Sequence, residues 1–147
     1  MNFKGREREG ILQEGIEAER VRNAIQSGLA GIADPKTQKT AIRSVLRKEE
    51  LYSGPYAASA PDLLVNFCPA FRVSWQSAVG GFVGSLIENN MRKWSGDHII
   101  DPESVPGILF MNRPVGANDC SIVDLAPTIL NYFDIPVGAA MEGKSLV

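Results

Sequence analysis

Apolar residues recur at helical spacing early in the chain. From Ile16 onward they return every three or four positions, with charged and amide side chains on the other face. The apolar positions are Ala18, Val21, Ile25, Leu29 and Ile32. This pattern predicts an amphipathic helix. It must stop near Asp34-Pro35, because a residue that precedes proline is pushed out of the helical region.

Several short stretches have the patterning of strands. Apolar and polar residues alternate over 41–46, which predicts a strand, and the alternation over 71–75 predicts an additional one. Apolar runs bounded by turn residues and prolines, at 61–67 and 107–112, predict buried strands. Glycines weaken the helical spacing of 77–90, which we expect to be irregular.

A second helix is predicted over residues 124–133. Its apolar stripe comprises Ala126, Ile129, Leu130 and Phe133. Pro127 is tolerated only in a first turn, and Asp124 suits the positive end of the helix dipole. Short strands mixed with amphipathic helices predict the α/β class, and without a linker or repeat the chain is expected to form a single domain over 1–147.

Composition narrows the possible partners. Fifteen basic and seventeen acidic side chains give a net charge of −2, so no nucleic-acid binding is expected. The apolar runs are far shorter than the roughly 20 residues of a membrane span. The polar start does not resemble a signal peptide, so a soluble protein is expected, with the cytoplasm favoured. Cys68 and Cys120 are far apart and are expected to be buried, reduced thiols.

The most informative loop, 94–102, contains the one histidine of the chain, His98, beside Asp97 and close to Asp101. Loops of this kind often display metal ligands or general bases, although a lone histidine is more often simply hydrogen-bonded. A compact hydrolase using His98, Asp97 and a serine is a further alternative, but no Gly-x-Ser-x-Gly elbow is present. A cysteine nucleophile paired with His98 also stays open, although Cys68 reads as core.

Three pieces of the sequence carry a family resemblance. They are Asn2-Phe3-Lys4-Gly5-Arg6-Glu7 with Gly10-Ile11; Arg47-Lys48-Glu49-Glu50-Leu51-Tyr52-Ser53-Gly54-Pro55 with Ala60-Pro61-Asp62-Leu63; and Trp94-Ser95-Gly96-Asp97-His98 followed by Pro106-Gly107-Ile108-Leu109-Phe110, Asp124-Leu125-Ala126-Pro127-Thr128-Ile129-Leu130 and Met141-Glu142-Gly143-Lys144-Ser145-Leu146. In this order and spacing they resemble the C-terminal portion of the alkaline phosphatase superfamily. Within it, the similarity is to the type I phosphodiesterase and nucleotide pyrophosphatase-like group of predicted phosphohydrolases and phosphomutases.

The resemblance implies a partial alkaline-phosphatase-like fold, with the chain supplying the C-terminal part of the sheet and its flanking helices. Enzymes of the superfamily hold two divalent metals, zinc or in some branches manganese, over a serine or threonine nucleophile that attacks a phosphoester. His98 stands at the position of the last metal ligand in chain order, and Asp97 and Asp101 are possible residues for orienting its ring. The nucleophile and the other ligands precede the part that this chain resembles. We therefore expect the chain alone to be inactive and to bind no metal tightly.

A different class of function is also compatible with the sequence. The chain could be a free-standing, non-catalytic module that keeps the scaffold and binds another protein or itself. If the chain is part of a larger protein, its sheet is cut partway and leaves an unpaired edge, so a homo-oligomer is expected.

Overall fold

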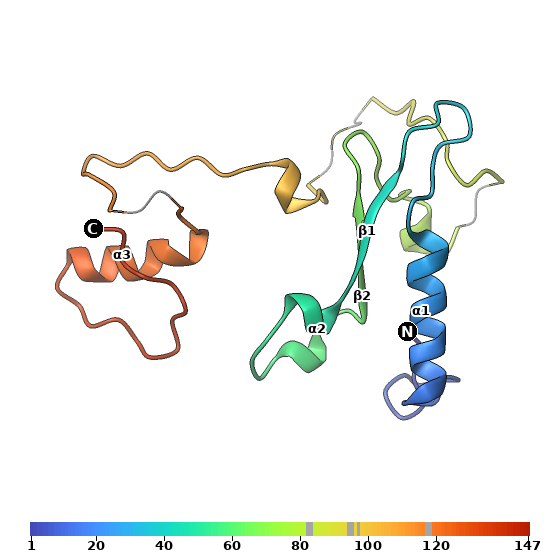
Figure 1. The fold of residues 1–147 in the computed structure, drawn as a ribbon, viewed down its shortest axis with the longest axis horizontal. Helices are drawn as coiled ribbons and strands as arrows, with labels where there is room; N and C mark the ends of the chain where they lie inside the picture. The colour runs from blue at the N-terminus through green and yellow to red at the C-terminus, as the bar shows by residue number, and fades with distance from the viewer. Residues whose placement is uncertain (82–83, 94–95, 97, 117–118) are drawn as a thin grey trace. The chain divides into compact units, whose positions relative to one another are not determined.

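The computed structural model describes residues 1–81, 84–93, 96, 98–116 and 119–147, and it contains two compact units, Met1–Val105 and Pro106–Val147. Helices and a two-stranded antiparallel sheet make the chain a mixed α and β protein, as the sequence predicts (Figure 1). The assignment of residues 1–147 to a single partial domain stays a prediction. No helix in the described part of the chain is long and apolar enough to cross a membrane.

The first helix, α1, spans Ile16–Leu29 and confirms the helical periodicity. It ends before Ile32, because Gly31 adopts a φ of 74°, in the left-handed region that favours glycine. The polar turn that follows is closed by Asp34, whose carboxylate accepts hydrogen bonds from the Lys36 backbone and the Thr37 hydroxyl at 3.0 and 2.6 Å.

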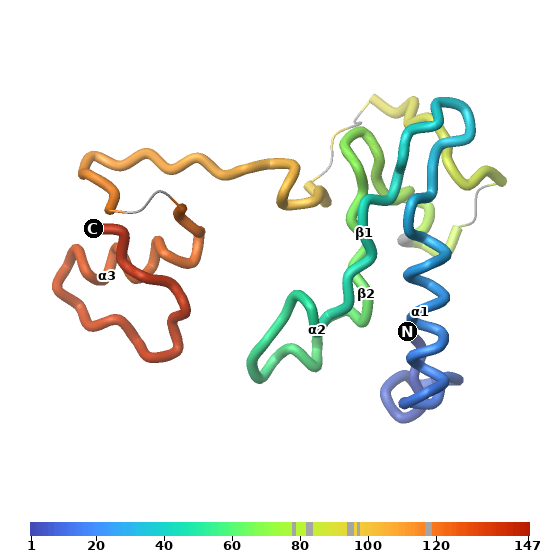
Figure 2. Tube along the Cα trace, viewed as in Figure 1, coloured from blue at the N-terminus to red at the C-terminus, as the bar shows by residue number. Residues whose placement is uncertain are grey.

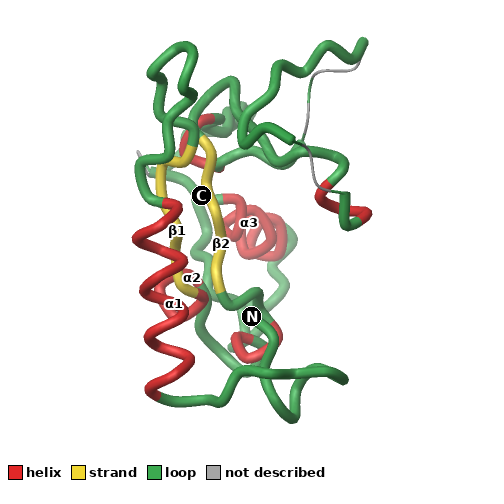
Figure 3. Tube along the Cα trace, turned by 90° about the vertical axis from the view of Figure 1, so that its right-hand side faces the viewer, coloured by secondary structure: helices red, strands yellow, loops and turns green. Residues whose placement is uncertain are grey.

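The sheet consists of β1, Ile42–Arg47, and β2, Leu63–Phe67. The two strands pair antiparallel, with Val45 opposite Val65, and both were predicted. β2 is half-buried along its length, so the expectation of a fully buried strand is wrong: a two-stranded sheet has no further strands to flank it. Helix α1 lies along the sheet, as Figures 1 and 3 show from two directions.

One side chain joins α1 to the sheet. The guanidinium of Arg47, the last residue of β1, donates hydrogen bonds to Gln26 Oε1 at 2.9 Å, Glu19 Oε2 at 2.9 Å and Asn23 Oδ1 at 2.7 Å. Gln26 returns a bond from its amide to the Val45 carbonyl at 2.9 Å. These three acceptors follow the three- and four-residue spacing of one helix face, which the planar fork of arginine can reach together.

The N-terminal loop folds back on itself and supplies much of the core of the first unit. Phe3 and Leu12 are bridged through their backbones and pack with Ala18 of α1, all three being buried. The turn requires glycine at position 10, where a Cβ would lie 1.8 Å from the carbonyl oxygen of Phe3.

The rest of the first unit contains only short elements. A four-residue helix, α2 (Lys48–Leu51), directly follows β1, and 3₁₀ turns occupy Ala57–Ser59, Ser77–Val79 and Pro102–Ser104. The additional strand expected over 71–75 is wrong. Arg72 instead lies over the ring of Trp75, and the described residues offer this segment no strand to pair with. The expectation that 77–90 is irregular agrees with the described part of that segment.

In the second unit, α3 spans Leu125–Tyr132 and is preceded by a 3₁₀ turn, Ile122–Asp124, so this helix is confirmed. The strand predicted over 107–112 is wrong. Its apolar side chains Ile108 and Phe110 are 81% and 90% exposed, and an extended segment becomes a strand only where another strand pairs with it, which no described segment does here.

The buried side of α3 also differs from the prediction. Pro127 and Thr128 are buried, whereas Ile129 and Phe133 of the expected stripe are 57% and 63% exposed. The helix is turned this way because its polar side chains bind the C-terminal segment, which loops back beneath it (Figure 2). The C-terminal segment, with its buried Leu146 and its bond to Thr128, therefore covers a different side of the helix from the predicted apolar stripe.

Candidate functional site

His98, the predicted metal-ligand position, lies in an exposed bend of the first unit. It belongs to a segment without regular structure that leads into the 3₁₀ turn Pro102–Ser104. Its neighbour Asp97, a predicted residue for orienting the ring, lies outside the described residues. The exposed position leaves His98 accessible to a ligand from solvent.

Asp101, the other predicted orienting residue, is buried and has partners of its own. Its Oδ2 lies 2.7 Å from Arg43 Nε, with the side chain only 1% exposed. The contact is an ion pair without the alignment of a hydrogen bond. Its Oδ1 accepts the backbone N–H of Glu103 at 3.1 Å and so caps the 3₁₀ turn, with Pro102 in the first position. A direct role in orienting His98 stays a prediction.

Arg43 fastens this segment to the sheet. Besides Asp101, its guanidinium binds Glu103 Oε2 at 2.5 Å, so one side chain of β1 holds two carboxylates that follow His98 closely. Sequence reasoning missed this contact, because Arg43 and Glu103 are 60 positions apart in the chain. The Asp-Pro-Glu order at 101–103 could have indicated that Asp101 is a cap.

The described residues do not by themselves form the metal centre that the resemblance implies. Among the residues that the structure describes, no three histidine, cysteine, aspartate or glutamate side chains come together in a way that could hold a metal ion. His98 would contribute one ligand to such a centre, and the expected zinc or manganese sites stay predictions.

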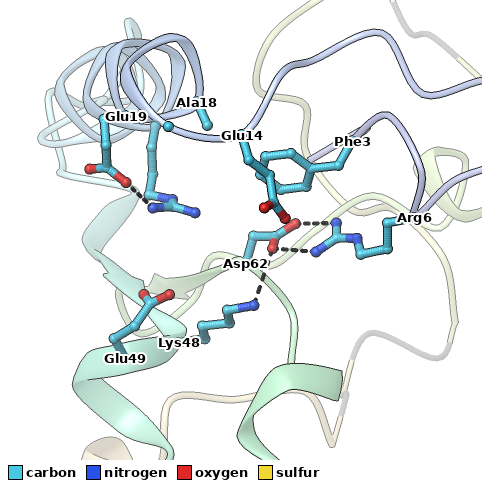
Figure 4. Close-up of a pocket in the computed structure, with 10 residues that line it drawn as sticks. Phe3, Arg6, Glu14, Ala18, Glu19, Lys48, Glu49 and Asp62 are labelled. Carbon is cyan, nitrogen blue, oxygen red and sulfur yellow. Dashed lines mark hydrogen bonds and ion pairs between the residues drawn. The ribbon is translucent and has the colours of Figure 1, made fainter.

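A second polar centre surrounds Asp62, just before β2 (Figure 4). Its carboxylate, 4% exposed, accepts hydrogen bonds from Arg6 Nη1 and Nη2 at 2.7 and 2.6 Å, and from the Met1 ammonium at 2.7 Å. Lys48 Nζ lies 3.7 Å from Oδ1. The hydrogen bonds from Arg6 hold the pKa of Asp62 well below its usual range, and the same contact raises the pKa of Arg6. This centre ties the N-terminal loop to the start of β2.

A third polar centre closes the second unit. Asp124 accepts the backbone N–H groups of Lys144 and Ser121 at 2.9 and 2.8 Å, which lowers the pKa of its carboxyl. The Thr128 hydroxyl donates to the Asp124 carbonyl at 2.6 Å and accepts the Leu146 N–H at 3.0 Å. Two pieces of the family resemblance, 124–130 and 141–146, thus bind each other.

Comparisons of the chain with protein-family models, with curated proteins and with solved structures found no match.

Proposed function

We propose that this chain is the C-terminal part of a metal-dependent phosphoester hydrolase or phosphomutase of the alkaline-phosphatase type, in which His98 is a metal ligand. The observation that supports the proposal is the position of His98. Its side chain is exposed, while the residues that follow it are fastened to β1 through the ion pairs of Arg43 with Asp101 and Glu103.

The other resemblance residues have a different part in this proposal. The buried carboxylates of Asp62 and Asp124 are bound by Arg6 and by the backbone N–H of Lys144, so we assign these residues to the scaffold. His98 contributes one neutral imidazole, which holds a divalent cation without adding charge. In the superfamily the metals activate a serine or threonine nucleophile and stabilise the charge of the transferring phosphoryl group of a small-molecule phosphoester.

Two measurements test this function. The 147-residue chain should not hydrolyse bis(p-nitrophenyl) phosphate with added zinc or manganese. A longer protein, translated from the same reading frame and starting upstream of Met1, should hydrolyse this ester. In that longer protein, His98→Ala should lower turnover by at least about a hundredfold and reduce the metal content, because one ion becomes under-coordinated.

The matched control is Met91→Ala, a change at an exposed residue in the same region, which should leave turnover unchanged. Near-normal turnover and metal content in folded His98→Ala protein would refute the assignment. Hydrolysis by the 147-residue chain that disappears with His98→Ala would show that the chain itself is the enzyme.

A second candidate function, a self-associating module without catalysis, is favoured by one observation. Ile129 and Phe133, four positions apart at the C-terminal end of α3, are 57% and 63% exposed, and Ile122 in the preceding 3₁₀ turn is 83% exposed. Apolar faces of this kind commonly mark contact surfaces. Sedimentation velocity at micromolar concentration should show a dimer or larger assembly that dissociates with Ile129→Glu. A stable monomer would exclude this function.

A further inference from the structure

The segment 107–112 of the second unit has the residues of a strand but no strand beside it. Figure 1 draws it, in orange, as an extended run without a helix or turn. Ile108 and Phe110 are 81% and 90% exposed, and Leu109 between them is 37% exposed. Because side chains two positions apart point to the same face of an extended backbone, Ile108 and Phe110 form one apolar face.

The backbone of this segment is available for pairing. Among the residues that the structure describes, no backbone hydrogen bond joins 107–112 to another part of the chain. A row of free N–H and C=O groups on an extended, exposed chain is a template on which another extended segment can pair. The feature that this segment presents is therefore a strand edge as well as an apolar face.

The charges around the segment favour a second copy of the same segment as its partner. Antiparallel self-pairing brings each residue close to its own counterpart across a two-fold axis, so a charged residue would meet a like charge. No charged residue occurs between Glu103 and Arg113, so two copies can pair without repulsion. Strand β2 is also uncharged, but it is half-buried and already pairs with β1.

The apolar pattern selects one register for this pairing. With Leu109 opposite Leu109 of the second copy, Ile108 lies opposite Phe110 on the same face, twice across the two-fold axis. β-Branched and aromatic residues are a favourable cross-strand pair. A register with Phe110 opposite itself would instead place Ile108 against Asn112 and would bring Arg113 into the ladder.

We propose that two copies of this chain associate by antiparallel pairing of residues 107–111, with Leu109 at the two-fold axis. The segment then becomes the strand that its sequence indicates, and the second copy supplies the partner. This contact is distinct from the exposed side of α3, and it does not rest on the proposed function.

Cysteine cross-linking of the 147-residue chain tests the register. Cys120 is exposed and Cys68 is half-buried, contrary to the prediction that both are buried, so both are first replaced by serine. In that background Leu109→Cys should give a disulfide-linked dimer on mild oxidation, because directly opposite Cα atoms lie about 4.5–5.5 Å apart, within the range of a disulfide.

The matched control is Asn112→Cys in the same segment and background. In the proposed register its two copies would be separated by about 20 Å along the strands, so it should cross-link far more slowly. Equal cross-linking of the two variants, or none with Leu109→Cys, would overturn the proposal.

Sedimentation velocity at micromolar concentration tests the backbone pairing. N–H groups point alternately toward and away from a neighbouring strand, so the double variant Ile108→Pro, Leu109→Pro removes a pairing donor in either arrangement. It should weaken association by about tenfold or more, whereas Ile108→Val, Leu109→Val keeps both N–H groups and should dimerise as the unmodified chain does. The prolines should not disturb folding, because neither backbone N–H is bonded within the described part of the chain.

Ile129→Glu separates this contact from one through α3, and it should leave the dimer intact. A dimer that dissociates with Ile129→Glu but not with the double proline variant would place the contact on α3 and refute the pairing of 107–111. A stable monomer of the unmodified chain would refute it as well.

Discussion

Asp62→Asn should destabilise the first unit strongly. The substitution keeps the shape of the side chain but removes the negative charge that Arg6, Lys48 and the Met1 ammonium approach. It also replaces one acceptor oxygen by a donor NH₂ group, which cannot accept from the guanidinium. The N-terminal loop then loses its polar attachment to the start of β2.

The expected cost follows from the geometry. Asp62 is 4% exposed and accepts two hydrogen bonds from Arg6 at 2.7 and 2.6 Å. Hydrogen bonds to charged groups contribute about 1.5–3 kcal/mol each, and solvent screening of the half-exposed arginine reduces this. We expect Asp62→Asn to lower the free energy of unfolding by about 2–4 kcal/mol near neutral pH.

The same contact sets a pH dependence. Because the pKa of Asp62 is lowered in the folded state, its stabilisation is present in full above the unfolded value near 3.8 and is lost as pH falls through the folded pKa. The stability difference between the unmodified chain and Asp62→Asn should therefore be constant from about pH 7 to about pH 5 and should shrink below about pH 4.

Urea denaturation followed by circular dichroism measures this difference across the pH range. Glu9→Gln is the control, because it removes one negative charge from an exposed position of the same loop. A loss of less than about 1 kcal/mol for Asp62→Asn at neutral pH, or an undiminished difference in acid, would refute the reasoning.

Further predictions concern the two units separately. Gly10→Ala should lower the free energy of unfolding, measured by thermal denaturation, by about 2 kcal/mol or more, because the new Cβ would lie 1.8 Å from the Phe3 carbonyl oxygen. Gly28→Ala in α1, where a new Cβ has nothing within 4 Å, should raise it by about 0.5–1 kcal/mol. Equal effects of the two would contradict this. Thr128→Val should cost about 1–3 kcal/mol and abolish hydrogen-exchange protection at the C-terminal segment; retained protection would show that the hydroxyl is dispensable. Leu130→Ala should lower the free energy of unfolding by only about 1 kcal/mol, because the side chain is half-buried. A loss above about 3 kcal/mol would show that Leu130 is buried, as the sequence predicts.

The sequence predicts the elements whose signals are local. The periodicity of α1 and the alternation of β1 are visible in neighbouring residues, and both elements form, although α1 ends at Leu29, before the predicted stop near Asp34-Pro35. The segment 107–112 has equally clear strand patterning, but pairing depends on a second segment, and the described residues provide none. The stripe of α3 fails for a related reason, because a hydrogen-bonded segment from residues 141–146 decides which side of the helix is covered.

The polar centres were less predictable than the helices. Arg6 and Asp62 are 56 positions apart, and Arg43 and Glu103 are 60 apart, so no spacing rule joins them. His98 is singled out because it is the one histidine in the chain, and its role as a metal ligand stays a prediction from the family resemblance. The ion pair of the nearby Asp101 with Arg43 could be seen only in the structure.

The bonds of Arg47 have a consequence for the order of folding. They join α1 to β1 across sequence separations of only 21 to 28 residues, whereas Arg6 and Asp62 must close a loop of 56. Shorter loops close with less entropic cost, and contacts between nearby segments form early in folding. Substitutions at Arg47 should therefore slow refolding, while substitutions at Asp62 should mainly accelerate unfolding, because the N-terminal loop docks after the rate-limiting step.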